Sequence, residues 1–356
     1  MNEKNLLQTQ VAFAEFGHKR FEHLLDVTVD LERLSEPGYW VVIGSFEQSW
    51  LLLKFRDLTT SNPQSTQWSG ISKDSWSSSL NKTQYIDAVN RLRDHISLGD
   101  VYQANICRVL KTKINKSDFD IESLFSLLRT GNPAPYSSLI KVSKDCHERL
   151  NKDILIASAS PELFLERDKD FIYSSPIKGT GKKESDLTEK DRAENVMIVD
   201  LVRNDLSRVC QIGSVEVPKL LEVQTHPGLV HLVSTVKGKL TEKTSWKEIF
   251  DATFPPGSVT GAPKISALKL IKKLEKANRD IYCGTIGWID SFSQTATLSV
   301  AIRTFWIDGD YLYFGTGAGI TWGSDASSEW QETELKCANL FEIASKQVVN
   351  SSPKVV

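Results

Sequence analysis

The last third of the chain constrains its fold most, because it consists of strand-like runs joined by tight turns. Apolar and β-branched residues fill 282–290, 296–307 and 311–316, and Asp308 and Gly309 separate the last two runs. An Asp-Gly pair between two such runs is typical of a two-residue hairpin turn. This region therefore predicts antiparallel strands that pair with their neighbours in the sequence.

Earlier segments alternate between helical and strand-like patterns. Apolar residues recur every three or four positions in 83–98, which predicts an amphipathic helix. Further helices are expected at 120–128, 190–206, 245–254, 262–277 (with Pro263 near the first turn) and 325–345 (with Ser324 or Asp325 as N-cap). Strands are expected at 39–44, 49–55, 101–110, 136–142, 154–160 and 162–166. The fold class is thus α+β, with large, mostly antiparallel sheets that form a sandwich and helices packed outside.

Composition and charge exclude several classes of function. The 356-residue chain has a formal net charge of −2 and no basic stripe or tail, so we expect no nucleic-acid partner. No apolar run approaches the length that spans a membrane, so we expect no membrane partner. The five cysteines are odd in number and lack CxxC spacing. We therefore expect reduced thiols and a cytoplasmic location.

Two of the expected helices each carry a pair of acids. Asp191 and Glu194 lie in one, and Glu329 and Glu332 lie in the other. A spacing of three residues puts both acids on one helical face, and a solvated acidic face is the ordinary explanation of such a pair. Here apolar residues flank the acids, which favours carboxylates that point into a cleft and need a counter-charge. Facing carboxylates with no nearby His or Cys are typical of a Mg²⁺ site.

Other segments could bind an anion. Arg303 lies among the apolar residues of an expected strand and requires an anionic partner, which could equally be a buried carboxylate. Gly315, Gly317 and Gly319 follow at the exit of the last strand, where their amides could form an anion-binding nest. The loop at 256–264 lacks the Gly-Lys-Ser or Gly-Lys-Thr of a P-loop, which argues against an ATPase.

Lys178 lies in the segment 174–180, which we predict to be a short connection between a strand at 164–173 and a charged helix. A lone lysine in a loop is ordinarily a solvated surface charge. Polar side chains at the end of a strand can nevertheless converge on a ligand. The other candidate groups, acidic and anion-binding, make this second interpretation worth testing.

A series of motifs in fixed order makes the chain resemble one known family. The motifs are Gly99-Asp-Val-Tyr-Gln-Ala-Asn, Ser160-Pro-Glu-Leu-Phe-Leu, Pro176-Ile-Lys-Gly-Thr, Asp191-Arg-Ala-Glu-Asn-Val-Met-Ile-Val-Asp-Leu-Val-Arg-Asn-Asp-Leu, His231-Leu-Val-Ser, Phe254-Pro-Pro-Gly-Ser-Val-Thr-Gly-Ala-Pro-Lys, Ala301-Ile-Arg-Thr, Gly317-Ala-Gly-Ile and Trp330-Gln-Glu-Thr. They are similar to those of the chorismate-utilising enzymes, and within them to the aminating branch that forms 4-amino-4-deoxychorismate. The resemblance covers 83–340. It implies a single chorismate-binding unit over 1–356, with a catalytic core at 83–345 and a shortened N-terminal lobe and linker at 1–82.

The resemblance implies a role for each matching residue. Glu194 and Glu332 would hold Mg²⁺, with Asp191 and Glu329 in support, and the ion would bind the ring carboxylate of chorismate. Glu162 would be the general acid that protonates the departing C4 hydroxyl. Arg303, Tyr282 and the amides of Gly317 to Gly319 would bind the enolpyruvyl carboxylate. The substrate-binding positions as a whole are Gly179, Thr180, Ser258, Thr260, Tyr282, Arg303, Gly317, Ala318, Gly319, Lys336 and Gln103.

Three positions bear on which reaction is catalysed. Gln103 stands where the water-adding relatives carry a basic lysine, and its neutral amide argues against water activation. His231 matches a histidine that is important for aromatisation in the anthranilate-forming relatives. Lys178 stands where anthranilate synthases have alanine. In the aminodeoxychorismate enzymes this lysine is thought to attack C2 and expel the C4 hydroxyl before ammonia attacks C4. Taken together, the resemblance implies three catalytic positions, which are Lys178, Glu162 and His231.

The resemblance also implies partners. Ammonia would come from a glutamine amidotransferase subunit in a heterodimer, and the product would serve p-aminobenzoate and folate synthesis. Two alternatives stay open. One is anthranilate synthase component I, which Lys178 opposes. The other is a non-catalytic chorismate-binding paralogue, which the complete set of acid, metal and anion groups opposes.

Overall fold

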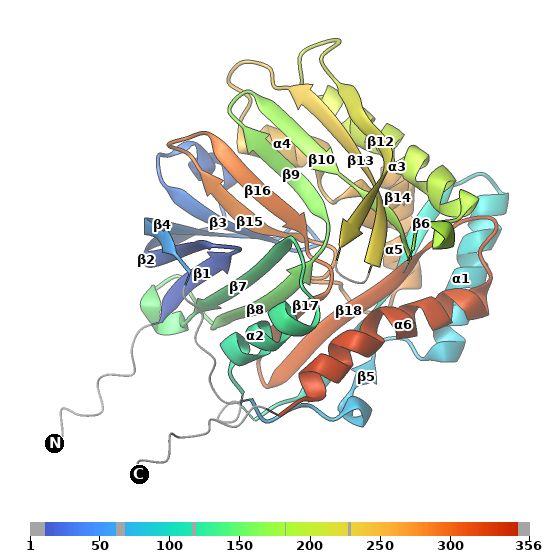
Figure 1. The fold of residues 1–356 in the computed structure, drawn as a ribbon, viewed down its shortest axis with the longest axis horizontal. Coiled ribbons are helices and arrows are strands. Elements are labelled where there is room, and N and C mark those ends of the chain that lie inside the picture. The colour runs from blue at the N-terminus through green and yellow to red at the C-terminus, as the bar shows by residue number, and fades with distance from the viewer. Residues whose placement is uncertain (1–10, 62–67, 116–118, 182, 227–228, 348–356) are drawn as a thin grey trace.

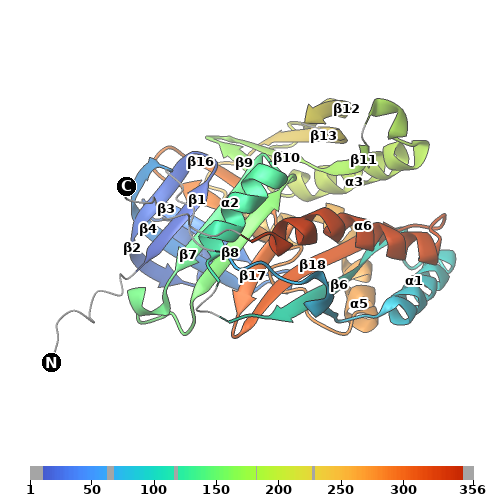
Figure 2. The same cartoon turned by 60° about the horizontal axis from the view of Figure 1, so that its bottom comes forward.

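The computed structural model describes residues 11–61, 68–115, 119–181, 183–226 and 229–347. In these ranges the strands form one antiparallel sheet that curls on itself, together with helices that pack on its faces (Figures 1 and 2). The predicted α+β class with mostly antiparallel strands is confirmed. None of the helices in the described ranges is long and apolar enough to cross a membrane. All five cysteines are free thiols, as predicted.

Strands make up most of the regular structure. They are β1 (Ala12–Phe16), β2 (Lys19–Thr28), β3 (Tyr39–Gly44), β4 (Trp50–Thr60), β5 (Ser77–Ser78), β6 (Gln103–Lys113), β7 (Tyr136–Val142), β8 (Ile154–Ser160), β9 (Leu163–Asp168), β10 (Phe171–Ser175), β11 (Ile177–Gly181), β12 (Glu216–His226), β13 (Leu229–Lys239), β14 (Gly261–Ala262), β15 (Thr285–Asp290), β16 (Thr295–Val300), β17 (Thr304–Asp308) and β18 (Tyr311–Ile320). The helices are α1 (Lys82–Ser97), α2 (Ile121–Gly131), α3 (Glu189–Ser207), α4 (Trp246–Thr253), α5 (Lys264–Leu274) and α6 (Ala326–Ser345).

The order of strand pairing explains how distant segments meet. Antiparallel pairs link β6, β18, β17, β8, β7, β1, β2, β4, β3, β15, β16, β9, β10 and β13 in that order. At one end β14 pairs with β6, and at the other β11 pairs with β13. Strands β1 and β2, which the sequence analysis did not predict, are part of this same sheet.

Capping side chains mark the start of several helices. Asn81 and Gln84 form a capping box on α1, and the Asp325 side chain accepts a hydrogen bond from the Ser328 amide at the start of α6. The prediction of Asp325 as the N-cap is thus confirmed. Helix α3 begins at a capping box between Thr188 and Asp191.

Two buried clusters hold the helices that carry the acids. One joins α3 to the sheet and to α4 through residues such as Ile198, Phe250 and Leu298. The other joins α6 to β17 and β18 through residues such as Phe305 and Leu340. Helix α3 packs on β13 and helix α6 packs on β18, so the opposite ends of the sheet each present one acidic helix (Figure 2).

Several predicted boundaries are wrong because a backbone turn interrupts an apolar run. The run at 164–173 is two strands, β9 and β10, separated by a turn at Lys169, whose φ is 54°. The run at 296–307 is also two strands, and the break between β16 and β17 contains Arg303 at a φ of 52°. A left-handed residue turns the backbone out of the extended conformation, and at Lys169 and Arg303 the strand ends.

Three further corrections affect the candidate site. Segment 174–180, predicted as a loop, contains the end of β10 and most of β11. The helix predicted at 262–277 is α5, and Pro263 is its N-cap residue and lies outside the first turn. The strand predicted from Tyr282 begins at Thr285, because Cys283 has a φ of 63°.

Candidate active site

Lys178 lies on strand β11, at one end of the curled sheet. A register shift between Lys178 and Thr180, with Gly179 at a φ of 79°, makes an irregularity in the strand at this point. The Lys178 ammonium donates a hydrogen bond of 3.1 Å to the carbonyl oxygen of Ser258. Ser258 lies in a short turn (Gly257–Val259) just before β14, which belongs to the other end of the sheet. The lysine therefore joins the two ends of the sheet.

Glu162 lies beside this contact. Its side chain is buried, with 5% of the residue exposed, and its carboxylate is hydrogen-bonded to the Ser258 side chain and to the Ile177 backbone. Burial raises the pKa of Glu162, and the Ser258 hydrogen bond and the positive charge of Lys178 offset this only in part. Such a carboxyl group keeps its proton to a higher pH than an exposed glutamate does, which is what a general acid requires.

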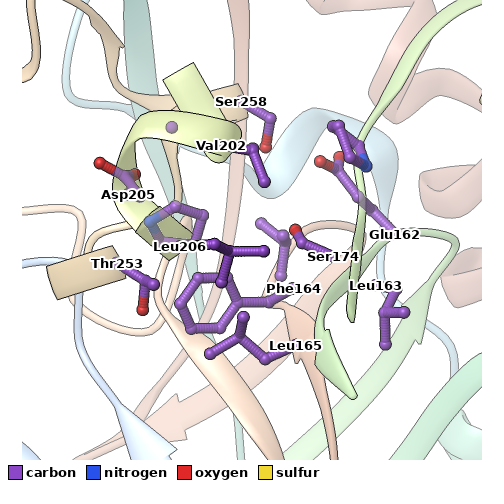
Figure 3. A pocket seen from close by; sticks show the side chains of 14 residues that line it. Glu162, Leu163, Phe164, Leu165, Ser174, Val202, Asp205, Leu206, Thr253 and Ser258 are labelled. Carbon is purple, nitrogen blue, oxygen red and sulfur yellow. The ribbon is translucent and has the colours of Figure 1, made fainter. Parts of the chain in front are cut away.

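A small cavity lies next to Glu162 (Figure 3). Its volume is about 20 Å³, which is room for roughly one water molecule. Apolar side chains such as Phe164 and Leu206 line it together with Ser174 and Asp205. In Figure 3 Glu162 and Ser258 lie toward one end of the cavity and Asp205 lies across from Glu162. A ring-sized ligand cannot enter a space of this size.

The predicted acidic groups of the two helices approach one another. Lys190 on α3 lies between them, because its ammonium is 3.3 Å from Glu329 Oε1 on α6 and 3.7 Å from Glu194 Oε1 on α3. Burial raises the pKa of Glu194, and the positive charges of Lys178 and Lys190 oppose this shift. Burial also works to raise the pKa of Glu332, but the Lys336 ammonium at 2.7 Å from its Oε1 keeps that pKa below its ordinary value.

The oxygen atoms of these carboxylates are of the kind that a hard cation prefers as ligands. Glu329 is almost fully buried, and its Oε2 has no hydrogen-bond partner among the residues that the structure describes. A buried carboxylate oxygen without a partner is costly, and a cation bound there would remove that cost. The described residues contain no set of three His, Cys, Asp or Glu side chains already gathered around one point. A Mg²⁺ ion here would therefore take protein oxygens from Glu194, Glu329 and Glu332 together with water or ligand oxygens.

Asp191 has a different environment from the other three acids. Its carboxylate accepts hydrogen bonds from the Thr188 amide at 2.8 Å and from the Thr188 hydroxyl at 2.7 Å. These bonds make the capping box that starts α3. A Cβ atom on Gly179 would lie 2.9 Å from the Asp191 Cβ, so β11 packs tightly against this turn. The structure thus gives Asp191 a role in placing Lys178, and its support of a metal stays a prediction.

Arg303 is suited to bind an anion. Burial lowers the pKa of its guanidinium, and no carboxylate among the described residues lies within salt-bridge distance. Its backbone carbonyl accepts a hydrogen bond of 3.0 Å from the Ala159 amide, which fixes the turn between β16 and β17. A half-buried guanidinium without a carboxylate leaves its donors for a ligand.

The glycines of β18 do not leave the strand, contrary to the prediction of a nest at its exit. Strand β18 pairs with β6 from Tyr311 to Ile320, and Gly315, Gly317 and Gly319 all lie within that ladder. Pairing with β17 on the other edge ends at Phe314. The Lys336 ammonium donates a hydrogen bond of 3.0 Å to the Gly317 carbonyl on β18.

The same glycines allow close packing of predicted site residues. A Cβ atom on Gly315 would lie 2.0 Å from Cγ of Tyr282, so the tyrosine ring lies directly on the β18 backbone. A Cβ atom on Gly319 would lie 2.6 Å from Nε2 of Gln103. Ala318, between them, is buried in the cluster that holds α1 and α5. Tyr282 and Gln103 therefore both pack against strand β18.

The remaining predicted residues differ in their accessibility to a ligand. Gln103 is fully buried, and neither polar atom of its side-chain amide has a hydrogen-bond partner within the described ranges. The Thr260 hydroxyl is also fully buried and donates to the Pro256 carbonyl at 2.8 Å, so it stabilises the turn around Ser258. His231 is buried on β13, opposite Thr180 of β11 in the ladder.

The sequence analysis missed two groups that shape the site. Lys190 could have been found from its i, i+4 spacing to Glu194. The second group is a buried ion pair, in which the Lys264 ammonium is 2.6 Å from Asp205 Oδ2 and donates to the Thr253 carbonyl at 2.8 Å. Nothing local in the sequence indicates this pair, because its members come from α3 and α5.

Comparison with known proteins gives the context of this site. The chain is 35% identical over 283 residues to aminodeoxychorismate synthase component 1 of Escherichia coli, an alignment that covers 76% of this chain and 60% of that protein. It is 37% identical over 268 residues to an anthranilate synthase component 1 of Haloarcula marismortui, covering 72% of this chain and 52% of that protein. The chain thus spans little more than half the length of these curated relatives.

A solved structure shares the fold. The menaquinone-specific isochorismate synthase of Escherichia coli superimposes with a TM-score of 0.78 and 16% sequence identity, over 96% of this chain and 90% of that one. The family model described as chorismate binding enzyme matches residues 42–342, which contain every residue discussed above as part of the site. The chain therefore belongs to the chorismate binding enzyme family.

Proposed function

We propose that the chain aminates chorismate at C4 to give 4-amino-4-deoxychorismate, as the component that binds chorismate. The observation that carries this proposal is the position of Lys178, which lies beside a buried glutamate and shares Ser258 with it. The Escherichia coli relative, an aminodeoxychorismate synthase component 1, supports the same choice. A lysine and a protonated acid at one place supply a nucleophile and a proton donor for the same substitution.

Positive charge for a substrate with two carboxylates comes from local groups, since the chain as a whole is nearly neutral. Arg303 has free donors for one carboxylate, and Lys336 lies next to the carboxylates of α6. Glu194, Glu329 and Glu332 would hold Mg²⁺. When bound, the ion would draw electron density from the ring through the second carboxylate.

The proposed reaction has two substitutions. Lys178 first gives one proton of its ammonium to solvent, and the free Nζ then forms a bond to C2 as the ring double bonds shift and the C4–O bond breaks. In the same step Glu162 gives its proton to the leaving oxygen, which departs as water. Ammonia then forms a bond to C4, the C2–N bond to Lys178 breaks, and the excess proton on the new C4 amine returns to Glu162. The sum is chorismate plus ammonia to 4-amino-4-deoxychorismate plus water, with the enzyme regenerated.

The ammonia would come from a glutamine amidotransferase subunit in a heterodimer. The relatives are named component 1, which supports a second subunit. Free ammonium salt should then replace glutamine and the partner in the reaction.

A second candidate is the formation of anthranilate, because the Haloarcula relative is an anthranilate synthase component 1. Lys178 opposes this candidate, since ortho amination does not need a lysine at that position. Water addition is opposed by Gln103, whose buried neutral amide cannot take a proton from water.

One assay separates these functions. The chain is incubated with chorismate, Mg²⁺ and ammonium salt, and the products are separated by chromatography with and without the downstream lyase. We expect p-aminobenzoate only when the lyase is present. Fluorescent anthranilate would support the second candidate, and the absence of both products would support a non-catalytic chorismate-binding protein.

A further inference from the structure

Lys190 contacts the acidic residues of both helices. Its ammonium lies 3.3 Å from Glu329 Oε1 on α6 and 3.7 Å from Glu194 Oε1 on α3. The Lys190 ammonium is thus a cation between two groups that would otherwise repel each other.

The carboxylates need such a cation when no metal is present. The Glu329 side chain is only 4% exposed, and Lys190 contacts its Oε1, while its Oε2 has no partner in the described part of the chain. Glu194 is also largely buried, with a side-chain exposure of 14%. Buried carboxylates of like charge destabilise the fold unless a cation lies near them. Lys190 supplies this charge but leaves one oxygen without a partner.

Lys190 is free to move away, unlike Lys336, which also contacts a carboxylate of α6. Lys336 is held by Glu332 at 2.7 Å and by the Gly317 carbonyl at 3.0 Å, so it has one anchor besides a carboxylate. The only hydrogen bond of Lys190 within the described residues is to Glu329, and 48% of its side chain is exposed. A half-exposed ammonium on a flexible four-carbon stem can turn out into solvent at little cost.

We propose that Lys190 is a displaceable counter-ion: it pairs with Glu194 and Glu329 in the metal-free protein and leaves when Mg²⁺ binds these carboxylates. This inference rests on the magnesium site in the proposed function. Mg²⁺ binds oxygen at about 2.0–2.1 Å, so an ammonium within hydrogen-bonding distance of the same Glu329 oxygen competes with it in space and in charge. The lysine therefore stabilises the metal-free fold and weakens metal binding.

The test uses two readouts other than activity, both on the full chain after removal of metals with EDTA. The first is the affinity for Mg²⁺ by titration calorimetry at low ionic strength, and the second is the melting temperature in EDTA. Lys190→Met should bind Mg²⁺ about two- to fivefold more tightly than the wild type, because a half-exposed ion pair has that order of strength. Its melting temperature in EDTA should fall by about 0.5–1.5 °C.

Two variants make the result specific. Arg203→Met removes a cation from the same helix with a similar exposure of 51% and a contact of 2.9 Å to Asp200, and it should leave the Mg²⁺ affinity unchanged. Lys190→Arg keeps the charge and should restore the melting temperature in EDTA. A Lys190→Met protein that binds Mg²⁺ no more tightly than the wild type overturns the inference while the metal site stands. A wild-type chain that binds no Mg²⁺ overturns both the inference and the metal assignment.

Discussion

Lys178 and Glu162 share a single neighbour, Ser258, whose carbonyl oxygen accepts a hydrogen bond of 3.1 Å from the lysine and whose side chain is hydrogen-bonded to the glutamate. The proposed nucleophile and the proposed acid are therefore positioned by the same residue. Ser258 in turn lies in a turn that the buried Thr260 hydroxyl stabilises. A disturbance of this turn should affect both groups together.

Replacing Lys178 tests the proposed covalent step. We expect Lys178→Ala to lower 4-amino-4-deoxychorismate formation by about 10³-fold or more, because no other group can form the bond to C2. Chorismate binding, measured by calorimetry, should remain. The control is Lys113→Ala, an exposed lysine at the end of β6. Normal product formation by Lys178→Ala would rule out the covalent role.

Replacing Glu162 tests its role as an acid and its raised pKa. We expect Glu162→Gln to lower the amination rate by about 10²–10⁴-fold, since an amide cannot give up a proton to the leaving oxygen. Glu166→Gln is the control, since it makes the same change at an exposed glutamate on the adjoining strand β9. Loss of activity in the control but not in Glu162→Gln would contradict the assignment.

The raised pKa of Glu162 also determines the direction in which the stability of the fold changes with pH. Because it is raised in the folded protein, the folded state binds this proton more tightly than the unfolded state does. The contribution to stability is therefore complete below the ordinary glutamate pKa of about 4.3 and declines as the pH rises through the raised value. Glu162→Gln does not titrate, so its melting temperature should fall less over this rise in pH than that of the wild type.

Local signals in the sequence predicted the helices and strands better than the turns that interrupt them. The cap at Asp325 and the apolar period of 83–98 each depend on a few neighbouring residues, and both predictions are confirmed. The turn at Arg303 was missed because a left-handed residue inside a run of apolar residues does not change the spacing of those residues in the sequence. Its position follows from how β16 and β17 pair with different strands, β9 and β8.

The site was predictable in its residue types and much less in its contacts. The capping box between Thr188 and Asp191 can be read from the sequence, yet the sequence analysis assigned Asp191 only to metal support. The contact between Lys190 and Glu329 joins residues 139 positions apart, so it depends on two helices meeting from opposite ends of the sheet. No local pattern encodes that arrangement.

Removal of metal tests the acids of α3 and α6. EDTA should abolish amination, and excess Mg²⁺ should restore it, because the substrate carboxylate otherwise meets the negative charges of Glu194 and Glu332. The rate of product formation before and after adding Mg²⁺ is the measurement. An unchanged turnover in EDTA would exclude a required metal.

The buried ion pair between Lys264 and Asp205 should stabilise the fold. Burial lowers the pKa of Lys264 and raises that of Asp205, so each charge depends on the other. We expect Lys264→Met to lower the free energy of unfolding by about 3–5 kcal/mol, because it leaves a buried carboxylate unpaired. Urea unfolding measures this loss.

Two further variants check this interpretation. The double variant Lys264→Met, Asp205→Asn should lose less stability than the sum of the two single variants, since the second change removes the unpaired charge. Lys247→Met breaks an exposed pair with Asp251 at 2.7 Å and should lower the stability much less than Lys264→Met does, because solvent screens the exposed pair. If Lys247→Met and Lys264→Met lower the free energy of unfolding equally, burial of the Lys264–Asp205 pair does not add to its contribution to stability.

Gly315 should be intolerant of any side chain, because the Tyr282 ring covers its Cα. A Cβ atom at this position would lie 2.0 Å from Cγ of the ring, and the ring is buried and cannot move aside without displacing its neighbours. We expect Gly315→Ala to lower the free energy of unfolding by about 1–3 kcal/mol or more and to raise the KM for chorismate as Tyr282 shifts. Gly323→Ala is the control, since nothing lies within 4 Å of a Cβ atom there. If Gly315→Ala is as stable as Gly323→Ala in urea, the ring does not lie on the strand as described.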